Sequence, residues 1–529
     1  MQLVLIFLAI CIFQNVQGVD PLVYTNVGLI RGVRATDGDY AMFIGIPYAR
    51  VIEENPFGDS IPFPKFNDTF EAYDDTAKCP QVYNQTILGT LDCLHLNIYV
   101  PSSASSENQM PVMVWVHGGA FSMGFSGRYT YNPRFLVQHD VIVVALNYRV
   151  NAYGFMCLDI PEVPGNQGLK DQFLAFRWIK DNIESFGGDV DKITLFGQSA
   201  GGHSIDLHLI SNKEKIYNNV ILQSGSALAT TVLFDPPKSA HLDMARYLGF
   251  ETNDTYEALS FLATSDTNLI IEATNELNII FKPCVEKEFD GVESFISRQW
   301  INSDIPKVTD LPVLLGFNEH EMARVHNHEN PDQFLNLDIV SRYIRQTFNL
   351  DDEEFAEMKA VVEHFYFGDE STNINVKNDI IAFDSDYTYI HPIHRTIGNY
   401  LEHDARAIFL YMFSYLSDRN AIPNYAAHSD DLRYLFDIHY TGMPSVQDQH
   451  LIDQMTTMWT NFAKYSDPTP VTTELLPVKW LPLTTYNYHY LRIDTELQLR
   501  SRPLNERMAF WDLFYKHNRE SQRGYDDTI

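Results

Sequence analysis

The chain has 529 residues, of which 45% are hydrophobic and 20% are charged, and this is the composition of a large globular protein. Its 69 acidic and 38 basic residues give a net charge of −31, which argues against nucleic acid and anionic membranes as partners because both bind basic surfaces. No linker, repeat or low-complexity run divides the chain, so we expect one large domain with insertions.

The chain begins with an apolar run over residues 3–13, which is too short to span a bilayer as a helix. Residues 16–18, VQG, suit a signal peptidase, so we expect a signal peptide over residues 1–18, although no Lys or Arg precedes the run. No later stretch is long and apolar enough to cross a membrane. Residues 19–529 are therefore predicted to form a single secreted, extracellular domain without a membrane anchor.

Cysteines and glycosylation sequons fit this secretory route. Cys11 leaves with the signal peptide, and the remaining four cysteines allow three pairings: Cys79, Cys93, Cys157 and Cys284. Cys157 lies in an apolar segment, and we interpret it as a buried free thiol. The three sequons begin at Asn67, Asn84 and Asn253. No His, Cys, Asp or Glu group has metal-ligand spacing, so we expect neither a metal nor another cofactor.

Taken in order, the apolar patterns predict strands that alternate with helices. Residues 23–34 and 40–46 alternate as an N-terminal antiparallel hairpin. Further strands are predicted at 94–100, 111–116, 141–147, 193–196, 220–223, 312–316 and 408–415. Residues 169–186 have the 3.6-residue period of an amphipathic helix. This order indicates an α/β fold with a mostly parallel sheet. Residues 227–310 and 320–405 are expected to form cap helices and surface excursions.

The strongest motif follows the predicted strand at 193–196. Residues 197–201 read Gly-Gln-Ser-Ala-Gly, and a helix-compatible stretch comes next. A strand, a tight turn and a helix are the context in which G-x-S-x-G exposes a nucleophilic serine, here Ser199. The pentapeptide alone would arise by chance in roughly one chain of this length in ten. The assignment therefore depends on the other groups that the chain supplies.

A serine hydroxyl needs a base, and the base needs an acid that orients it. Glu321 comes just after the strand at 312–316, and His428 comes after the strand at 408–415. Serine, acid and histidine thus follow one another in the chain order expected when G-x-S-x-G lies between a strand and a helix. Each of the three comes after the end of a strand. Glu319 is the alternative acid, but its spacing from the strand is less favourable.

Acyl transfer also needs donors for the negative oxygen of the tetrahedral intermediate. Residues 117–119, His-Gly-Gly, form a glycine turn directly after the strand at 111–116. The backbone N–H groups of Gly118 and Gly119 are the expected donors, and Ala200 supplies a third.

These motifs stand among longer segments that resemble the type-B carboxylesterase family, the carboxylesterases and cholinesterases of the α/β-hydrolase fold. The segments are GIPYA (45–49), DCLHLNIYVP (92–101), HGGAF (117–121), NYRV (147–150), GNQGLKDQ (165–172), FGGD (186–189), FGQSAGG (196–202), QSGSA (223–227) and HSDDLRYLF (428–436). The resemblance implies a central, mostly parallel sheet flanked by helices. Within the family, the chain looks most similar to secreted insect esterases of the antennal and hormone-degrading kind.

The resemblance also implies roles for single residues. Ser199 would be the nucleophile, Glu321 the acid and His428 the base. The oxyanion donors would be Gly118, Gly119 and Ala200, with Ser224 beside Glu321 and a disulfide between Cys79 and Cys93.

Three functions are compatible with these residues. A secreted serine carboxylesterase is favoured because every triad member is present, whereas a non-catalytic adhesion or binding member of the fold would not need them. A cholinesterase would offer a Trp face to a quaternary ammonium group, but the loop at 80–92 contains none. Gln198 stands where that family usually has Glu, which removes a negative charge. We therefore expect neutral, apolar esters as small-molecule substrates: odorant or pheromone acetates, hormone esters or xenobiotic esters.

Overall fold

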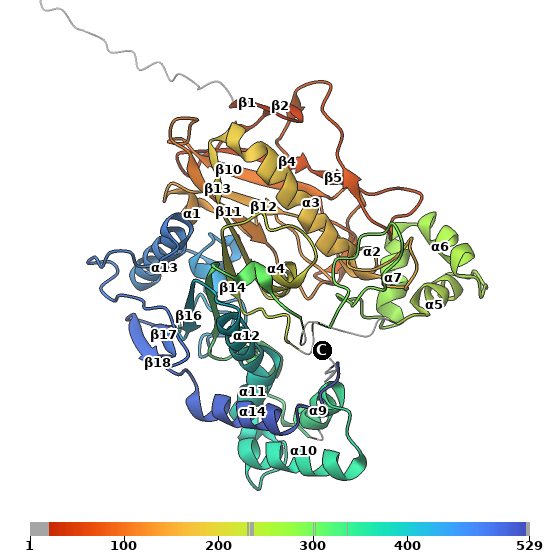
Figure 1. The fold of residues 1–529 in the computed structure, drawn as a ribbon, viewed down its shortest axis with the longest axis vertical. Helices are drawn as coiled ribbons and strands as arrows, with labels where there is room; N and C mark the ends of the chain where they lie inside the picture. The colour runs from red at the N-terminus through yellow and green to blue at the C-terminus, as the bar shows by residue number, and fades with distance from the viewer. Residues whose placement is uncertain are drawn as a thin grey trace, which may run out of the picture.

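The computed structural model describes residues 21–229, 232, 237–299, 301, 303–335 and 337–524, and the predicted signal peptide lies outside them. Within this part of the chain, one sheet of eleven strands runs through the molecule (Figure 1). Its spatial order is β18 (Gln498–Ser501), β17 (His489–Ile493), β16 (Ala407–Phe413), β15 (Pro312–Asn318), β14 (Asn219–Gln223), β13 (Gly188–Gln198), β11 (Met110–Val116), β12 (Ile142–Leu146), β10 (His95–Pro101), β4 (Tyr40–Pro47) and β3 (Val33–Arg34).

The central strands of this sheet are parallel and its two edges are antiparallel. Neighbours from β12 through β17 pair in parallel, whereas β10, β4 and β3 on one side and β18 on the other pair antiparallel. The predicted mostly parallel sheet is therefore confirmed. The expected N-terminal hairpin is two hairpins: β1 (Leu22–Thr25) pairs with β2 (Gly28–Arg31), and β3 pairs with β4.

Alternation along the buried strands builds a hydrophobic core on each face of the sheet. In β11, Val114 faces the core that includes Ile179 and Ile205, while Trp115 faces the core that includes Trp459. Ile179 belongs to α3 (Gln167–Asn182), Ile205 to α4 (Ala200–Ile210) and Trp459 to α13 (Val446–Tyr465). The sheet is thus buried on both sides, which is why its strands read as continuous apolar runs.

The predicted amphipathic helix over 169–186 is present as α3 followed by a 3₁₀ turn, Ile183–Phe186. Gly187, with a φ of 83°, ends it in a left-handed conformation. Shorter helices lie beside the sheet: α1 (Arg134–Val137), α2 (Asn151–Phe155) and α8 (Ala323–His326). Small strands lie outside the large sheet: β5 (Ala49–Arg50) pairs with β6 (Ile61–Pro62), and β8 (Gln81–Tyr83) pairs with β9 (Thr86–Leu88). A further strand, β7 (Phe70–Glu71), pairs with β2.

The two segments that were expected to be insertions form helices at two places on the sheet's periphery (Figure 1). The first group is α5 (Ala240–Tyr247), α6 (Thr255–Ala263) and α7 (Thr267–Glu276). The second group is α9 (Ile339–Thr347), α10 (Asp352–Phe367), α11 (Lys377–Ser385) and α12 (His391–Glu402), which the C-terminal α14 (Asn505–His517) joins.

Two disulfides cross-link the chain. Cys79 pairs with Cys93 across a short loop, as the family resemblance implied. Cys157 pairs with Cys284, so the interpretation of Cys157 as a free thiol was wrong. Both cysteines are buried, and the Asn166 side chain holds Cys284 in place by accepting from its N–H at 3.0 Å and donating to its carbonyl at 2.8 Å. Residues 127 apart in sequence give no local signal of this pairing.

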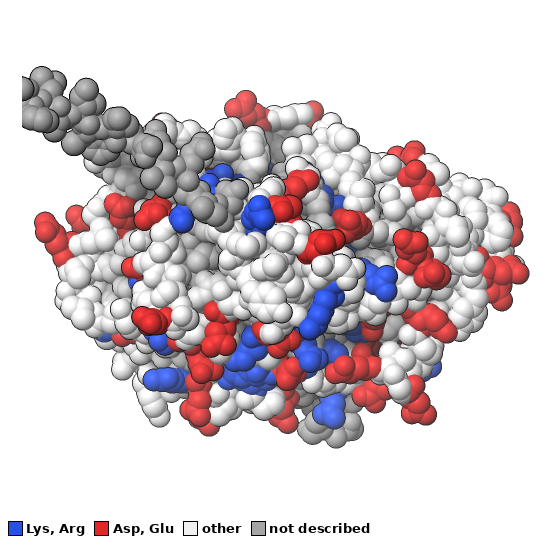
Figure 2. Space-filling view, turned by 90° about the horizontal axis from the view of Figure 1, so that it is seen from above, with Lys and Arg blue, Asp and Glu red and all other residues white. Residues whose placement is uncertain are grey.

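In the described ranges, every helix falls short of the length and apolar character needed to cross a bilayer. Figure 2 shows one face of the molecule, where acidic side chains are spread over the surface and basic ones lie among them. The negative net charge is therefore distributed on this face, not gathered into one site.

Candidate active site

Ser199 lies on a strained turn between β13 and α4. Its φ of 56° and ψ of −125° are rare for a residue with a side chain, and such strain costs about 1–3 kcal/mol. The strain is held by close packing, because a Cβ on Gly201 would lie 2.0 Å from the Val116 carbonyl at the end of β11. Ser199 is partly exposed, so its hydroxyl is reachable while its backbone is fixed.

Glu321 and His428 meet beside this turn. The loop after β15 carries Glu321 and the loop after β16 carries His428, and these strands are neighbours in the sheet. His428 Nδ1 donates to Glu321 Oε2 at 2.5 Å. The Glu321 side chain is fully buried, whereas the His428 side chain is 20% exposed. A buried carboxylate on Nδ1 fixes the ring and leaves Nε2 with its lone pair toward the accessible side.

The other oxygen of Glu321 is also occupied. The Ser224 hydroxyl donates to Oε1 at 2.6 Å and the Asn318 N–H donates at 2.8 Å. With these bonds the carboxylate orients His428 in one direction only. The carboxylate of the alternative acid, Glu319, lies 3.7 Å from Arg492, and the carboxylate that is hydrogen-bonded to His428 is that of Glu321.

The loop that carries His428 is held by two further carboxylates. Asp430 accepts from the Ala427 N–H at 2.9 Å, and Asp431 accepts from Gln223 at 2.7 Å and from Tyr411 at 2.8 Å. Burial raises the pKa of Asp431, and hydrogen bonds from these partners lower it in part. Sequence reasoning gave neither aspartate a role, although both lie in the matched HSDDLRYLF segment.

Two side chains that sequence reasoning did not place also contact His428. The Gln198 amide nitrogen donates to His428 Nε2 at 3.1 Å, which brings the imidazole to the residue just before Ser199. The Tyr389 ring packs on the imidazole with centroids 4.5 Å apart. Tyr389 lies in the segment DSDYTYIH (384–391), which matches no motif, so no sequence signal singled it out.

The glycine turn after β11 lies against Ser199. A Cβ on Gly118 would be 3.1 Å from Ser199 Cβ, so the two backbones nearly touch. In the described part of the chain, the N–H groups of Gly118 and Gly119 donate to no backbone carbonyl. The Ala200 N–H belongs to the first turn of α4, where amides lack helical partners. The amides of Gly118 and Ala200 thus lie directly beside the serine, and that of Gly119 follows in the same turn.

His117, which directly precedes the glycine turn, is held in place by Tyr148. Its ring stacks on Tyr148 at 4.3 Å between centroids, and Tyr148 donates its hydroxyl to the His117 carbonyl at 2.9 Å. Burial lowers the pKa of His117 to about 4, so the ring is neutral at physiological pH. A neutral, stacked ring supports the turn without adding charge beside the serine.

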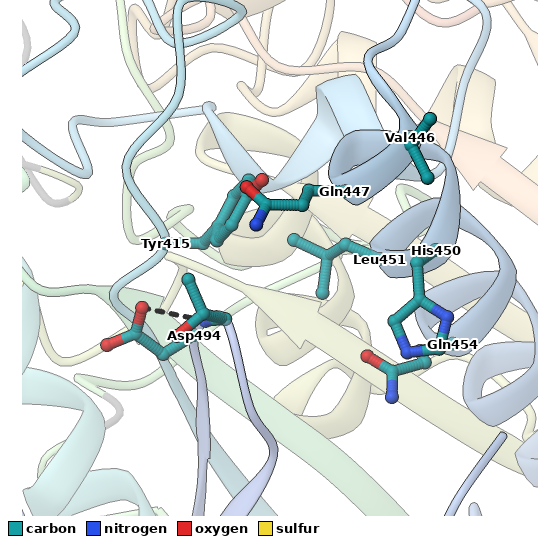
Figure 3. Close-up of a pocket in the computed structure, with 8 residues that line it drawn as sticks. Tyr415, Val446, Gln447, His450, Leu451, Gln454 and Asp494 are labelled. Carbon is teal, nitrogen blue, oxygen red and sulfur yellow. Dashed lines mark hydrogen bonds between the residues drawn. The ribbon is translucent and has the colours of Figure 1, made fainter. Parts of the chain in front are cut away.

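No group of three His, Cys, Asp or Glu in the described ranges is arranged to hold a metal ion. A separate hollow of about 270 Å³ lies beside α13, lined by residues that include Tyr415, Leu451 and Asp494 (Figure 3). Its lining contains neither Ser199 nor His428. The sequon residues Asn67, Asn84 and Asn253 are all exposed, away from the core.

Comparisons with known proteins show which proteins the whole chain is similar to. A model of the carboxylesterase family matches residues 19–511. The chain is 30% identical to the bile salt-activated lipase of Rattus norvegicus, over 93% of this chain and 85% of the lipase. It is 27% identical to the juvenile hormone esterase of Heliothis virescens, over 86% and 87%. The crystal structure of juvenile hormone esterase from Manduca sexta, with OTFP covalently attached, superimposes with a TM-score of 0.80 at 27% identity, covering 94% of this chain and 100% of that one.

Proposed function

Because the chain belongs to the carboxylesterase family and is a carboxylic ester hydrolase, we propose that it is a secreted serine esterase that cleaves neutral, apolar esters through an acyl-Ser199 intermediate. The observation that carries this proposal is the 2.5 Å hydrogen bond from His428 to the buried Glu321, beside a serine on a strained turn. A relative of the same fold with a covalently attached compound also supports a covalent route.

In the proposed acylation, Ser199 Oγ forms a bond to the ester carbonyl carbon while its proton passes to His428 Nε2. The carbonyl electron pair moves to oxygen, where the amides of Gly118, Gly119 and Ala200 donate to it. The C–O bond to the alcohol then breaks, and His428 returns the proton to the leaving oxygen. Water repeats the sequence: it adds to the acyl carbon while His428 takes its proton. The bond from the acyl carbon to Ser199 Oγ then breaks, His428 returns the proton to Oγ, and the acid leaves.

The preference for neutral esters is supported by the residues around the serine. Gln198 places an uncharged amide where a carboxylate would attract a cation. The loop closed by Cys79 and Cys93 has no tryptophan to receive a quaternary ammonium group. Secretion is supported by the two disulfides, which persist in oxidising compartments, and by the exposure of all three sequons.

The test is hydrolysis of 1-naphthyl acetate by the purified protein, before and after treatment with an organophosphate, followed by mass spectrometry of the Ser199 peptide. We expect turnover to disappear together with the appearance of one phosphoryl adduct on Ser199. Ser199→Ala is the control and should lose several orders of magnitude in kcat, keep its fold and take up no adduct. Turnover that survives in Ser199→Ala, or an adduct elsewhere, would refute the acyl-serine route. A series of acyl lengths and a choline ester would then test the substrate preference.

A further inference from the structure

Tyr389 is carried by one turn of π-helix, Asp386–Ile390, inserted between α11 and α12. The wider turn adds one residue to the helical path, and such turns are common at functional sites. The flanking residues anchor it: Asp386 is buried and bonds Arg507 at 2.5 Å, and the Tyr387 ring stacks on Tyr343 at 4.7 Å. Residues 383–388 and 390 are buried, whereas Tyr389 is partly exposed. The turn therefore holds Tyr389 at an accessible edge from a rigid base.

From this π-helical turn the Tyr389 side chain extends toward both His428 and Ser199. Its ring covers the imidazole of His428, with centroids 4.5 Å apart and planes 31° from parallel. Its hydroxyl lies near the Ser199 side chain, which lowers the pKa of Tyr389 in part. Burial raises the pKa of Tyr389, chiefly by desolvation and further through the negative charge of Glu321. The phenol therefore stays protonated at neutral pH and remains a hydrogen-bond donor.

The Gln198 amide competes with the Ser199 hydroxyl for the Nε2 lone pair of His428. The lone pair of His428 Nε2 accepts from the Gln198 amide at 3.1 Å, and this contact draws the ring toward Gln198. Glu321 fixes only the opposite side of the ring, at Nδ1. A group that limits tilting of the imidazole and holds Ser199 Oγ nearby would restrict the pair to one geometry.

We propose that Tyr389 is a positioning residue that holds the His428 ring in plane through stacking and holds Ser199 Oγ through its hydroxyl. This inference rests on the proposed acyl-serine function. Tyr389→Phe keeps the ring and loses the hydroxyl, so kcat should fall about tenfold, the effect of one neutral hydrogen bond. Tyr389→Leu loses both contacts and should fall about a hundredfold. KM should change little in either variant because substrate binding is not the step affected.

The experiment measures kcat and KM for 1-naphthyl acetate and the rate constant for phosphorylation of Ser199 by diethyl p-nitrophenyl phosphate, followed by intact mass. In this reaction the Oγ–P bond forms, the P–O bond to p-nitrophenolate breaks, and His428 takes the serine proton. The leaving group needs no proton, so the rate reports the Ser199–His428 pair alone. We expect Tyr389→Phe to slow it by the same factor as kcat.

Tyr387→Phe is the matched control, because it removes a tyrosine hydroxyl from the same π-turn. That hydroxyl donates to the Tyr343 carbonyl at 2.9 Å, away from Ser199. Tyr387→Phe should lower the melting temperature and leave both rate constants near the wild-type values. Equal rate losses in Tyr387→Phe and Tyr389→Phe would show a structural role and overturn the inference, as would an increase in KM alone.

The two proposals fail in different ways. If the wild-type protein reacts with the phosphate ester and Tyr389→Phe reacts as fast, the positioning role is wrong and the esterase function stands. If the wild-type protein takes up no adduct on Ser199, the serine is not activated and both proposals are wrong.

Discussion

The Glu321 carboxylate accepts hydrogen bonds on both of its oxygens, and its replacement by an amide would disturb all of them. In Glu321→Gln the new NH₂ group can face His428 Nδ1, which favours the tautomer with its proton on Nε2. That tautomer cannot accept the serine proton, so we expect kcat to fall by about 10⁴-fold. Steady-state hydrolysis of 1-naphthyl acetate measures the loss.

Glu319→Gln is the control for this substitution, two residues away in sequence. Its carboxylate lies 3.7 Å from Arg492 and does not contact His428. We expect activity near that of the wild-type protein, because a partly exposed ion pair contributes about 1 kcal/mol or less to stability. Loss of activity in Glu319→Gln with retention in Glu321→Gln would reverse the assignment of the acid.

Asp206, inside α4, should make stability depend on pH. It accepts from the Ala227 N–H at 2.7 Å and from the Tyr400 hydroxyl at 2.6 Å, yet burial raises its pKa from 3.8 to about 6. Between these values the folded state binds more protons than the unfolded state, so stability falls as pH rises. The stabilisation is complete below pH 3.8 and is lost as pH rises through about 6.

Asp206→Asn removes this titration and isolates its effect. We expect the difference in unfolding free energy between wild type and variant to fall by roughly 2 kcal/mol from pH 4 to pH 7, because a shift of one pKa unit corresponds to about 1.4 kcal/mol and this range covers most of the shift. Urea unfolding of both proteins across this range measures it, since the other titrating groups are shared. A constant difference would mean that Asp206 is ionised throughout.

At the level of helices and strands, the approach of α4 to β11 positions the nucleophile. Gly201→Ala would place a Cβ 2.0 Å from the Val116 carbonyl, so α4 must move away from β11. That movement shifts Ser199 and the Ala200 N–H together. We expect destabilisation of about 1–3 kcal/mol and a fall in kcat of roughly tenfold or more. Calorimetry and steady-state kinetics measure the two effects.

Gly398→Ala in α12 makes the same chemical change where there is room. A Cβ there has no neighbour within 4 Å, and the residue is an exposed helical glycine. We expect unchanged activity and a gain of about 1 kcal/mol, because alanine is the better helix former. If both glycine variants behaved alike, the close approach at Gly201 would not be what fixes the elbow.

Most of the central sheet could be predicted because its strands are buried on both faces and read as continuous apolar runs, as in β11 and β12. The strand β17 and the edge strand β18 escaped prediction because they are short and their apolar pattern is interrupted by Arg492 and Arg500. The π-turn also escaped, because its residues continue a helical pattern and only the packing of Asp386 and Tyr387 shows the extra residue.

The sequence predicted those residues of the candidate site that directly follow a strand. Ser199, Glu321 and His428 each follow a strand of one parallel sheet, so the order of the motifs places them at one edge. What sequence could not supply were contacts between distant elements, such as that of Tyr389 with His428, and the pairing of Cys157. Those contacts depend on how the segments 227–310 and 320–405 pack against the rest of the chain. The pattern of apolar residues within a segment does not predict this packing.

Across the molecule, the two disulfides close loops of very different length. Cys79 and Cys93 are separated by 14 residues, and Cys157 and Cys284 by 127. In the chain-entropy model, such loops contribute about 3 and about 5 kcal/mol, respectively. The pair Cys157→Ala and Cys284→Ala should therefore destabilise the protein by about 2 kcal/mol more than the pair Cys79→Ala and Cys93→Ala.

Apparent melting midpoints at one fixed scan rate compare these two double variants. The long-loop variant should keep its kcat at 25 °C, because neither cysteine contacts the triad. A long-loop variant as stable as the wild-type protein would show that the packing around Asn166 holds this region without the covalent bond.

The Cys157–Cys284 bond also determines whether a single proteolytic cut separates the chain into two fragments. It encloses Ser199, while Glu321 and His428 lie outside the loop. A single cut at the exposed turn between α5 and α6 would leave the nucleophile on one fragment and its base on the other. Among the described residues, this bond would then be the one covalent link between the fragments. The nicked enzyme should stay active, because β14 and β15 still pair across the cut. On a denaturing gel it should run as one band without a reductant and as two bands with one.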